Sequence, residues 1–326
     1  MPQRHAAMVN PTASQTLGFL LIDDFALMSY AALVEAFRAA NTLSGKMLYK
    51  WRHYSIAGSP ARASNGVEIM VDGIPDAKTE PCDILFVCAG GNPSAFANRD
   101  TFAQLRAAAA RGTTIAGVSG GPYILARAGL LAGRRCTVHW EHEPAFREAF
   151  PQLVVEGGLY VIDGPSITCA GGTAGLDLAV ELIRRHHGPA IAAGVGEWFI
   201  RTQPREGSGA QRPALAARYH VAHPGVVAAL AAMETHIAEP LGRSELAARA
   251  GVSVRQLERL FARHIGQTIG QHYLALRLDA AKRLLRETGL SRLDVAVACG
   301  FADVSHFSRS FRRRFGQSPV RARASG

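Results

Sequence analysis

The segment around Ser119 has residue types and spacing that suit a nucleophilic reaction. Residues 117–121 match the pattern G-x-S-x-G, which places a serine hydroxyl on a sharp strand-to-helix turn. His139 follows 20 residues later and is a candidate base for the hydroxyl proton. The acids available to orient this imidazole are Asp163 and Asp177, and neither stands in a convincing position. A hydrolase or amidase that uses Ser119 and His139 stays open as an alternative function.

Other residues of the same region suit binding rather than catalysis. Gly90, Gly91 and Asn92 follow the apolar run CDILFVCA and offer backbone N–H groups to an oxygen atom. Nearby aromatic rings suit a cationic amine. The candidate ligand-binding residues are Phe25, Gly91, Asn92, Ser119, Gly120, Tyr123, His139 and Trp140. Two structural interpretations stay open: the aromatic rings could be core residues, and Ser119 and His139 could have structural roles.

A second kind of chemistry is indicated by residues 244–266, SELAARAGVSVRQLERLFARHIG. Gly251 stands where the chain must reverse, Ser253 with Gln256 fits a helix cap, and Gly266 fits the helix end. The inward face is apolar, with Leu257, Leu260 and Phe261. The outward face carries Val254 together with long donors and acceptors that suit base edges and phosphates in a major groove: Arg255, Glu258, Arg259 and Arg263.

Residues 291–316, SRLDVAVACGFADVSHFSRSFRRRFG, repeat this helix-turn-helix pattern. Ser291 with Asp294 fits a cap, Gly300 fits the turn, and the apolar stripe consists of Phe301, Phe307, Phe311 and Phe315. The outward residues are Val304, Ser305, His306, Ser308, Arg309, Arg312 and Arg313. A long helical pattern, QHYLALRLDAAKRLLRETG, separates the two units. One chain is therefore predicted to reach two successive major grooves of double-stranded DNA, about 34 Å apart.

The elements that must position Ser119 alternate between short apolar runs and helical patterns over residues 16–200. The runs are LGFLLI, WRHYSIAG, VEIMVDG, CDILFVCAGG, TIAGVS, RCTVHW and the hairpin-like LVVEGGLYVIDGPSITC. This alternation predicts an α/β fold with a flavodoxin-like, mainly parallel sheet covered on both faces. Ligands of such sheets bind at the carboxyl ends of the strands.

A break in periodicity separates this region from the helix-turn-helix units. The sequence RTQPREGSGAQRPALAARYHVAHP is rich in Pro, Gly, Ser and charge. We therefore expect a ligand-sensing domain at 16–200, a linker at 201–222, and an all-α DNA-binding domain at 223–322. A surface loop within one large domain is the alternative.

Charge is unevenly distributed between these regions. Residues 223–326 carry 16 basic and 8 acidic residues, whereas the preceding 222 residues carry 20 basic and 18 acidic. A basic C-terminal third behind a nearly neutral larger part is expected when only one domain displaces counterions from phosphate.

The C-terminal pattern is similar to the signature of the AraC/XylS family over roughly residues 223–322. The matching residues are Ser253, Leu257, Leu260, Phe261, Gly266, Arg277, Leu278, Ala281, Leu284, Leu285, Gly300, Phe301, Phe307, Phe311, Phe315, Gly316 and Pro319. Two helix-turn-helix units at this separation, closed by Phe-Gly-x-Ser-Pro, make the resemblance specific.

The segment 117–122 resembles the elbow of the class I glutamine amidotransferase-like superfamily, of PfpI type. In that family the elbow residue is a cysteine, a histidine follows on the next strand, and an acid stands in the first strand-helix segment. Here Ser119 takes the cysteine position, His139 fits the histidine position, and the first segment has Met28 and Ser29 instead of an acid. The resemblance implies a pocket without its low-pKa thiolate, which is expected to bind rather than to catalyse.

Joined to an AraC-type domain, this fold resembles the GlxA-like group of regulators, which includes activators responding to arginine, glycine betaine and carnitine. The resemblance implies a non-enzymatic transcriptional activator of a catabolic operon. A small nitrogenous inducer would bind the first domain, and the partners would be double-stranded DNA, RNA polymerase and a second copy of the chain. A first domain that only dimerises is a further alternative.

The composition argues against a membrane-spanning, a secreted or a zinc-binding protein. No apolar run approaches the ~20 residues of a membrane span, and the lead MPQRHAAMVNPTASQ lacks the apolar core of a secretory signal and is expected to be disordered. The five cysteines are far apart and mostly within apolar runs, which predicts reduced core thiols in a cytoplasmic protein without a zinc site. We expect neither a metal nor a cofactor.

Overall fold

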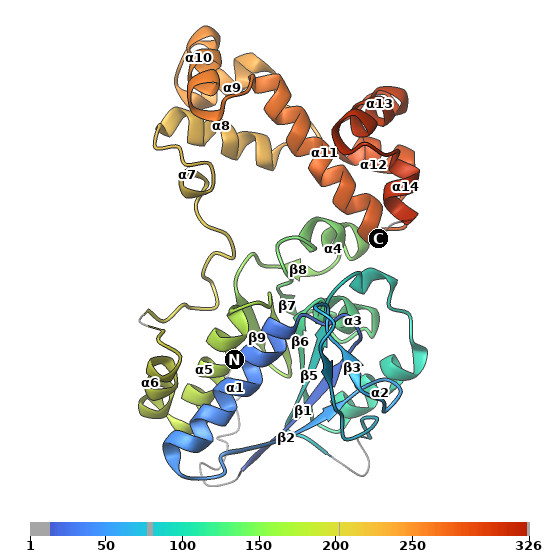
Figure 1. Cartoon of the computed structure of the whole chain (residues 1–326), viewed down its shortest axis with the longest axis vertical. Coiled ribbons are helices and arrows are strands. Elements are labelled where there is room, and N and C mark those ends of the chain that lie inside the picture. Colours follow the sequence, from blue (N-terminus) through green and yellow to red (C-terminus); the bar gives the residue numbers. More distant parts are fainter. Residues whose placement is uncertain (1–13, 77–80, 202, 325–326) are drawn as a thin grey trace, which may run out of the picture. The chain divides into compact units, whose positions relative to one another are not determined.

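The computed structural model describes residues 14–76, 81–201 and 203–324, so most of the expected N-terminal lead lies outside the described residues. The chain forms two compact units, Met1–Gln211 and Arg212–Gly326 (Figure 1). The division falls within residues 201–222, which the sequence predicts as a linker.

The first unit is built on a six-stranded sheet of order β2-β1-β5-β6-β10-β9. Its strands are β1 (Gln15–Leu21), β2 (Tyr49–Tyr54), β5 (Ile84–Ala89), β6 (Thr114–Ser119), β9 (Tyr160–Asp163) and β10 (Ser166–Cys169). All pairings are parallel except β9 with β10, which form a hairpin. Every residue of β5 is buried, as expected of a central strand covered on both faces. The predicted flavodoxin-like α/β class is confirmed.

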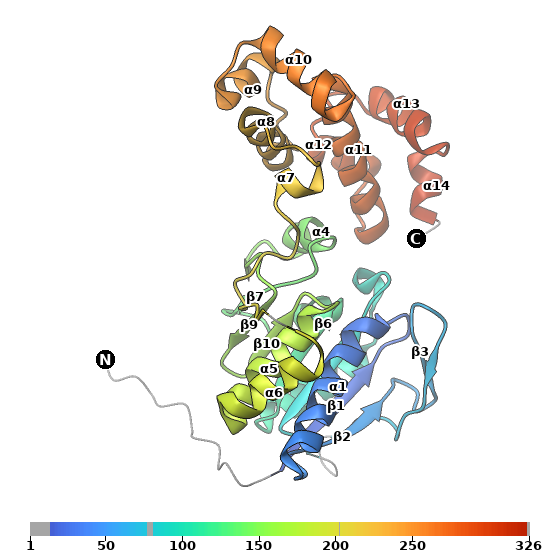
Figure 2. The same ribbon diagram turned by 60° about the vertical axis from the view of Figure 1, so that its left-hand side comes forward.

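Helices cover both faces of this sheet; those of one face lie in front of it in Figure 2, and those of the other are labelled in Figure 1. One face packs against α1 (Leu27–Ser44) and α5 (Ala174–His187), on which α6 (Pro189–Trp198) packs in turn, and the other against α2 (Arg99–Ala110) and α3 (Gly121–Arg127). Successive residues of a strand enter opposite cores: Phe19 and Phe86 belong to the first, Leu20 and Val87 to the second.

Several short elements lie outside the main sheet. They are the strands β3 (Ala61–Arg62), β4 (Glu68–Ile69), β7 (Arg135–Cys136) and β8 (Val154–Val155), the 3-10 turn η1 (Pro93–Ala95) and the helix α4 (Glu143–Ala149). Several of these strands are shorter than the apolar runs that predict them. The expectation that RCTVHW forms a strand is wrong beyond Cys136, and β7 pairs with β8. From Thr137 onward side chains hold the backbone instead, because Thr137 donates through N to Thr168 Oγ1 and through Oγ1 to the Gly158 carbonyl. His139 therefore lies in a loop before α4.

The second unit is all-helical. Its helices are α7 (Leu215–Arg218), α8 (Pro224–Thr235), α9 (Arg243–Ala250), α10 (Val254–Ile265), α11 (Ile269–Glu287), α12 (Arg292–Ala298), α13 (Val304–Phe315) and α14 (Pro319–Ala324). The helix pairs α9–α10 and α12–α13 are the two predicted helix-turn-helix units, and α11 connects them (Figure 1).

The predicted caps and turns are confirmed. Ser253 Oγ accepts from Gln256 N at 3.2 Å, and Ser291 and Asp294 bond reciprocally at 3.1 Å. Gly251 and Gly266 adopt φ values of 69° and 72°, which end α9 and α10 in the left-handed conformation.

Each helix-turn-helix unit has its own core on α11. Leu257, Phe261 and Tyr273 are buried in the first core with residues of α8 and α9. On the second half of α11, Leu278, Ala281 and Leu285 are buried, as are Val295, Phe307 and Phe311 of the second helix-turn-helix unit. The apolar stripes assigned from the sequence thus become two packed interiors.

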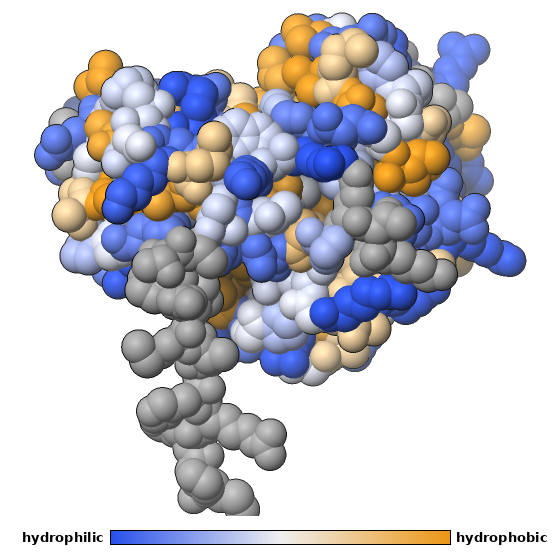
Figure 3. Space-filling model, turned by 90° about the horizontal axis from the view of Figure 1, so that it is seen from below, coloured by the Kyte–Doolittle hydropathy of each residue, from blue (hydrophilic) through white to orange (hydrophobic). Residues whose placement is uncertain are grey.

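On the face in Figure 3, hydrophobic residues lie in separate groups among hydrophilic ones. Among the described residues of the first unit, Trp198, Met47 and Leu43 are large hydrophobic residues with exposed fractions between 45% and 61%. Among the described helices, none combines the length and apolarity needed to cross a membrane.

Two glycines of the second unit share a backbone conformation but differ in surroundings. Gly300 has φ +72° and a Cβ there would lie 2.5 Å from Pro240 Cγ, whereas Gly316 has φ +71° and open space. We expect Gly316→Ala to cost about 1–2 kcal/mol, the penalty of the left-handed conformation. Gly300→Ala should cost a further ~1–3 kcal/mol because Pro240 must move. Urea unfolding of the full-length variants measures both, and equal costs would contradict the close packing of Gly300.

Candidate ligand pocket and nucleic-acid interface

Ser119 lies on a strained turn at the carboxyl edge of the sheet. It ends β6 with φ +59° and is 8% exposed. The glycines on either side are needed for space: a Cβ at Gly117 would lie 2.7 Å from Pro122 N, and one at Gly121 would collide with the Val87 carbonyl oxygen. The sequence pattern therefore does produce the sharp turn that it predicts.

Small residues surround the Ser119 side chain. A Cβ on Gly171, in the loop after β10, would lie 2.7 Å from Ser119 Cβ. Ser29, which is 2% exposed, accepts a hydrogen bond from Gly172 N through its Oγ at 2.7 Å. Ser29 thus binds the same glycine loop that covers Ser119, whereas the neighbouring Met28 is 61% exposed.

The histidine expected to serve Ser119 is held by its own loop. His139 Nδ1 accepts from Glu141 N at 3.3 Å, and the ring lies against Trp140 and His142 at centroid distances of 5.5 and 5.8 Å. Nδ1 is thus engaged within the loop that carries the ring.

The two acids considered as orienting groups are engaged elsewhere. Asp163 accepts from Arg135 N at 2.9 Å at the start of β7. Asp177, whose side chain is fully buried, accepts from both Arg201 and Arg205. The described contacts of these carboxylates are therefore those of structural ion pairs.

A cavity of about 170 Å³ opens beside Gly171 at this edge of the sheet. Its lining residues are His139, Trp140, Leu159, Ala170, Gly171, Gly172, Thr173, Ala174, Arg205 and Gln211. We call this cavity the chamber. It is smaller than the ~300–1,000 Å³ typical of pockets for drug-sized ligands, so it suits a small metabolite.

The structure brings together only some of the predicted ligand-binding residues. His139 and Trp140 line the chamber, and Ser119 lies next to its Gly171. Gly120 packs against Pro93, which directly follows Gly91 and Asn92, and its N donates to the Ala89 carbonyl at 2.9 Å. The segment Gly90–Asn92 is thus a neighbour of the elbow rather than a wall of the chamber.

Two of the proposed aromatic residues are core residues in the structure. Phe25 is 0% exposed and packs edge-on against Tyr30 at 5.8 Å. Tyr123 is 1% exposed and packs against Phe146 at 4.9 Å. Their rings already have protein neighbours, which leaves Trp140 as the predicted aromatic residue that faces the chamber.

The chamber residues that sequence reasoning missed include the Gly171–Gly172 pair, Thr173, Arg205 and Gln211. The first two follow β10 directly, so the rule that ligands bind at strand carboxyl ends could have found them. Arg205 and Gln211 lie in the segment interpreted as a linker and carry no such signal.

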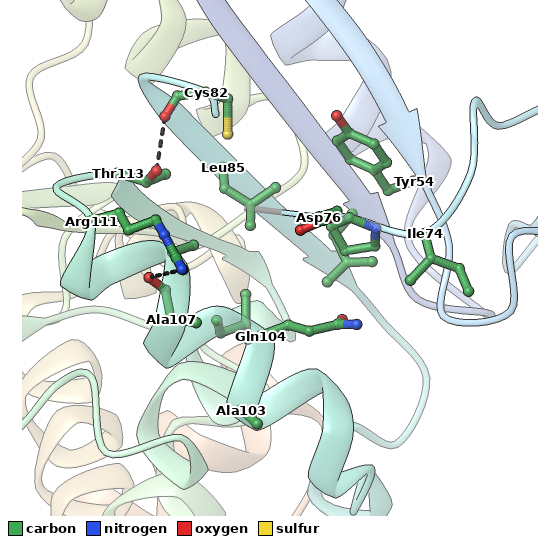
Figure 4. Close-up of a pocket in the computed structure, with 14 residues that line it drawn as sticks. Tyr54, Ile74, Asp76, Cys82, Leu85, Ala103, Gln104, Ala107, Arg111 and Thr113 are labelled. Atoms are coloured by element: carbon green, nitrogen blue, oxygen red, sulfur yellow. Dashed lines mark hydrogen bonds between the residues drawn. The ribbon is translucent and has the colours of Figure 1, made fainter. Parts of the chain in front are cut away.

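A larger cavity of about 470 Å³ lies elsewhere, between α2 and the strands β1 and β5 (Figure 4). Its walls are mostly apolar, including Leu85, Ala103 and Tyr54. Polar groups there bond within the protein: Thr113 Oγ1 donates to the Cys82 carbonyl at 2.9 Å, and Arg111 donates to the Ala107 carbonyl at 3.3 Å. We prefer the smaller chamber because it lies at the strand carboxyl ends and its lining is more polar than that of the larger cavity.

The cysteines do not supply a nucleophile to either cavity. All five are free thiols, and four of them are buried. Burial raises the pKa of Cys169 to about 12 and that of Cys82 to about 11, so both stay protonated at neutral pH.

The first predicted DNA-contacting face lies on α10. Arg255, Glu258, Arg259 and Arg263 are exposed, whereas Val254 is half-buried. Glu258 pairs with Arg243 of α9 at 3.0 Å. This helix therefore presents three arginines to solvent from the second position of a helix-turn-helix unit, where the recognition helix stands.

The second predicted face lies on α13. Its exposed residues are Ser305, His306, Arg309, Arg312 and Arg313, and Val304 and Ser308 are half-buried. Asp303, which sequence reasoning missed, caps this helix by accepting from Ser305 N and His306 N at 2.8 and 3.0 Å. These N–H groups hold the pKa of the Asp303 carboxyl below its ordinary value, so the cap stays ionised.

Two arginines attach the second helix-turn-helix unit to α11. Arg277 donates to the Cys299 and Gly300 carbonyls at 2.8 and 2.6 Å and stacks over Phe301 at 4.2 Å. Arg314, part of the basic run on α13, forms a bidentate pair with Asp279 at 2.7 and 3.1 Å. Charge density alone does not separate such structural arginines from DNA-binding ones.

Comparison with known proteins agrees with this division. Residues 16–185 match the DJ-1/PfpI family, and residues 246–325 match a helix-turn-helix domain. The chain is 45% identical over 313 residues to the HTH-type transcriptional regulator CdhR of Pseudomonas aeruginosa, covering 95% of this chain and 92% of that protein. It is 40% identical over 306 residues to the regulator GlxA of Rhizobium meliloti, covering 94% of each.

A solved structure shares the fold of the first unit. A THiJ/PfpI family protein from Pseudomonas syringae superposes with a TM-score of 0.53 at 24% identity, covering 77% of this chain and 97% of that one. Two regions of the chain match these families, and the two regulators match it over nearly their whole length. The chain therefore belongs to the HTH-type transcriptional regulators that join a DJ-1/PfpI domain to an AraC-type DNA-binding domain.

Proposed function

We propose that this regulator activates a catabolic operon in response to a small nitrogenous metabolite, an amino acid or a quaternary amine. The observation that carries its DNA-binding part is the pair of exposed basic faces on α10 and α13, attached to the two halves of one helix. In this proposal residues 16–200 sense the ligand, 201–222 connect, and 223–322 bind double-stranded DNA in the cytoplasm.

The proposed mechanism begins in the chamber of the first unit. A ligand that lies against Trp140 and His139 changes the packing of this unit or its arrangement in a homodimer. The connecting segment transmits the change to the recognition helices, which then position RNA polymerase at the promoter. A ligand can shift such an equilibrium only by binding one arrangement more tightly than the other.

One observation favours an enzymatic alternative, namely the strained turn at Ser119. Such strain is common at nucleophiles, and it is stored at a cost of about 1–3 kcal/mol. The proposed role is nevertheless non-catalytic, because a serine hydroxyl needs an oriented base beside it. The described bonds of the candidate groups lie elsewhere: His139 Nδ1 accepts from the Glu141 backbone, Asp163 from the Arg135 backbone, and Asp177 pairs with Arg201.

Specific and nonspecific DNA contacts can be separated by two arginine variants. Arg259 lies on the outer face of α10 and is proposed to contact a base. Arg259→Ala should therefore weaken the free energy of binding to the cognate site by about 1–3 kcal/mol and relax the base preference at one base pair. Arg313 is proposed to contact phosphate, so Arg313→Ala should weaken binding to all sequences similarly and reduce the salt slope by about 1. Fluorescence anisotropy on cognate and random duplexes at several salt concentrations measures both. Equal losses on the two duplexes for Arg259→Ala would refute its assignment.

Ligand sensing and catalysis make opposite predictions for the full-length protein. We expect glycine betaine, L-carnitine or L-arginine to raise the melting temperature of the wild type, because binding to the folded state stabilises it by mass action. Ser119→Ala should keep this shift, since Ser119 lies next to the chamber without serving as a nucleophile. A hydrolytic turnover of amide or ester substrates that Ser119→Ala abolishes would instead establish the enzyme. A first unit that only dimerises would give neither signal.

A further inference from the structure

The segment that follows α6 folds back onto the first unit. Arg201 and Arg205 both donate to Asp177, whose side chain is fully buried on α5. Further along, the Gly207 carbonyl accepts from Leu159 N at 2.7 Å, and Gly158 leaves no room for a Cβ against that carbonyl. Residues 203–211 are therefore part of the fold around the chamber, although their composition is that of a linker.

The Asp177 cluster has an excess of positive charge. One carboxylate faces two guanidinium groups, and Arg201 is the more buried of them, with a side chain 13% exposed against 44% for Arg205. The nearby carboxylate of Glu181 is occupied by Arg184 and Arg185, each at 2.7 Å. Asp177 thus keeps a buried counter-ion in Arg201 even when Arg205 bonds to something else.

Arg205 is the more exposed guanidinium, and it lines the chamber. Its Nη2 also donates to Thr173 Oγ1 at 2.9 Å, which places it beside the glycine loop after β10. A guanidinium offers five donors in a planar fork that matches a carboxylate. The same cavity is also lined by Trp140 and His139, whose rings suit a cationic or apolar group.

Gln211 fixes another part of the chamber wall. Its Oε1 accepts from Trp140 N at 2.7 Å, and its Nε2 donates to the Val138 and Gly158 carbonyls at 2.9 and 2.8 Å. Both ends of the amide thus bond to the backbone, so Gln211 is a positioning residue for the Trp140 loop. The next peptide bond leads to Arg212, the first residue of the second unit.

We propose that Arg205 binds a carboxylate of the small molecule that fills the chamber, and that the segment 203–211 thereby becomes part of the ligand site. This inference rests on the proposed sensing function and adds the residue and the ligand group. Filling the chamber engages Arg205 and the loop held by Gln211, so occupancy acts directly on the chain that leads to the DNA-binding unit. No separate relay through the sheet is required.

The test compares matched ligands that differ in the carboxylate. Glycine betaine and choline share a quaternary ammonium group, and L-arginine and agmatine share a guanidinium group, but only the first of each pair has a carboxylate. Isothermal titration of the full-length wild type should show preference for the carboxylate member of at least one pair. Arg205→Gln should reduce that preference about 10-fold or more, the loss expected when a charge-assisted hydrogen-bonded pair is removed.

Two further variants separate binding from folding. Arg205→Lys keeps the charge and should retain part of the preference, which a purely structural role of Arg205 would not explain. Arg184→Gln removes an arginine that pairs with Glu181 outside the chamber, and it should leave the preference unchanged. A structural loosening would weaken both members of a pair equally and leave their ratio as in the wild type.

The outcomes also separate this inference from the proposed function. If none of the four compounds binds the wild type, the sensing function for this ligand class and the carboxylate assignment fail together. If a carboxylate compound binds the wild type and Arg205→Gln leaves its preference intact, only the role of Arg205 is overturned. Loss of the preference in Arg205→Gln, with partial rescue by lysine, establishes it.

Discussion

The attachment of both helix-turn-helix units to the single helix α11 is the constraint on which DNA recognition depends. Two recognition helices can address one duplex together only when their separation is fixed to match its helical repeat. Arg277 fixes the second turn by bonding two carbonyls that α12 leaves at its end, and Arg314 ties α13 to Asp279. The first helix-turn-helix unit is held by the core around Tyr273, whose hydroxyl also donates to the His236 carbonyl at 2.6 Å. Both helix-turn-helix units are thus joined to α11 by buried contacts and directional bonds.

The sequence predicted the helical unit well because its determinants are local. A cap such as Ser253 is bonded to a residue three positions away, and a turn such as Gly251 needs only a positive φ. The sheet was also predictable, because a short continuous apolar run such as the six residues of β5 is typical of a strand that is buried on both faces. Local rules decide these elements before any tertiary contact is considered.

The chamber was predicted less well because it depends on contacts between distant residues. Gln211 bonds to residues more than 50 positions earlier in the chain, and Arg205 bonds to Asp177 across 28 positions. A segment rich in Pro, Gly and Ser gives no periodic sign of such docking. Phe25 and Tyr123 illustrate the opposite case, because aromatic residues near strand ends face inward or outward according to packing that periodicity does not specify.

The most direct test of the account is the spacing of the DNA site. After the cognate duplex has been selected and the base pairs contacted by α10 and α13 mapped, 5 or 10 base pairs are inserted between the two contacted segments. A rigid α11 predicts that both insertions reduce affinity to that of a single half-site, since the helix cannot lengthen by a turn of DNA. Full affinity after the 10-base-pair insertion would contradict the fixed arrangement of the two recognition helices.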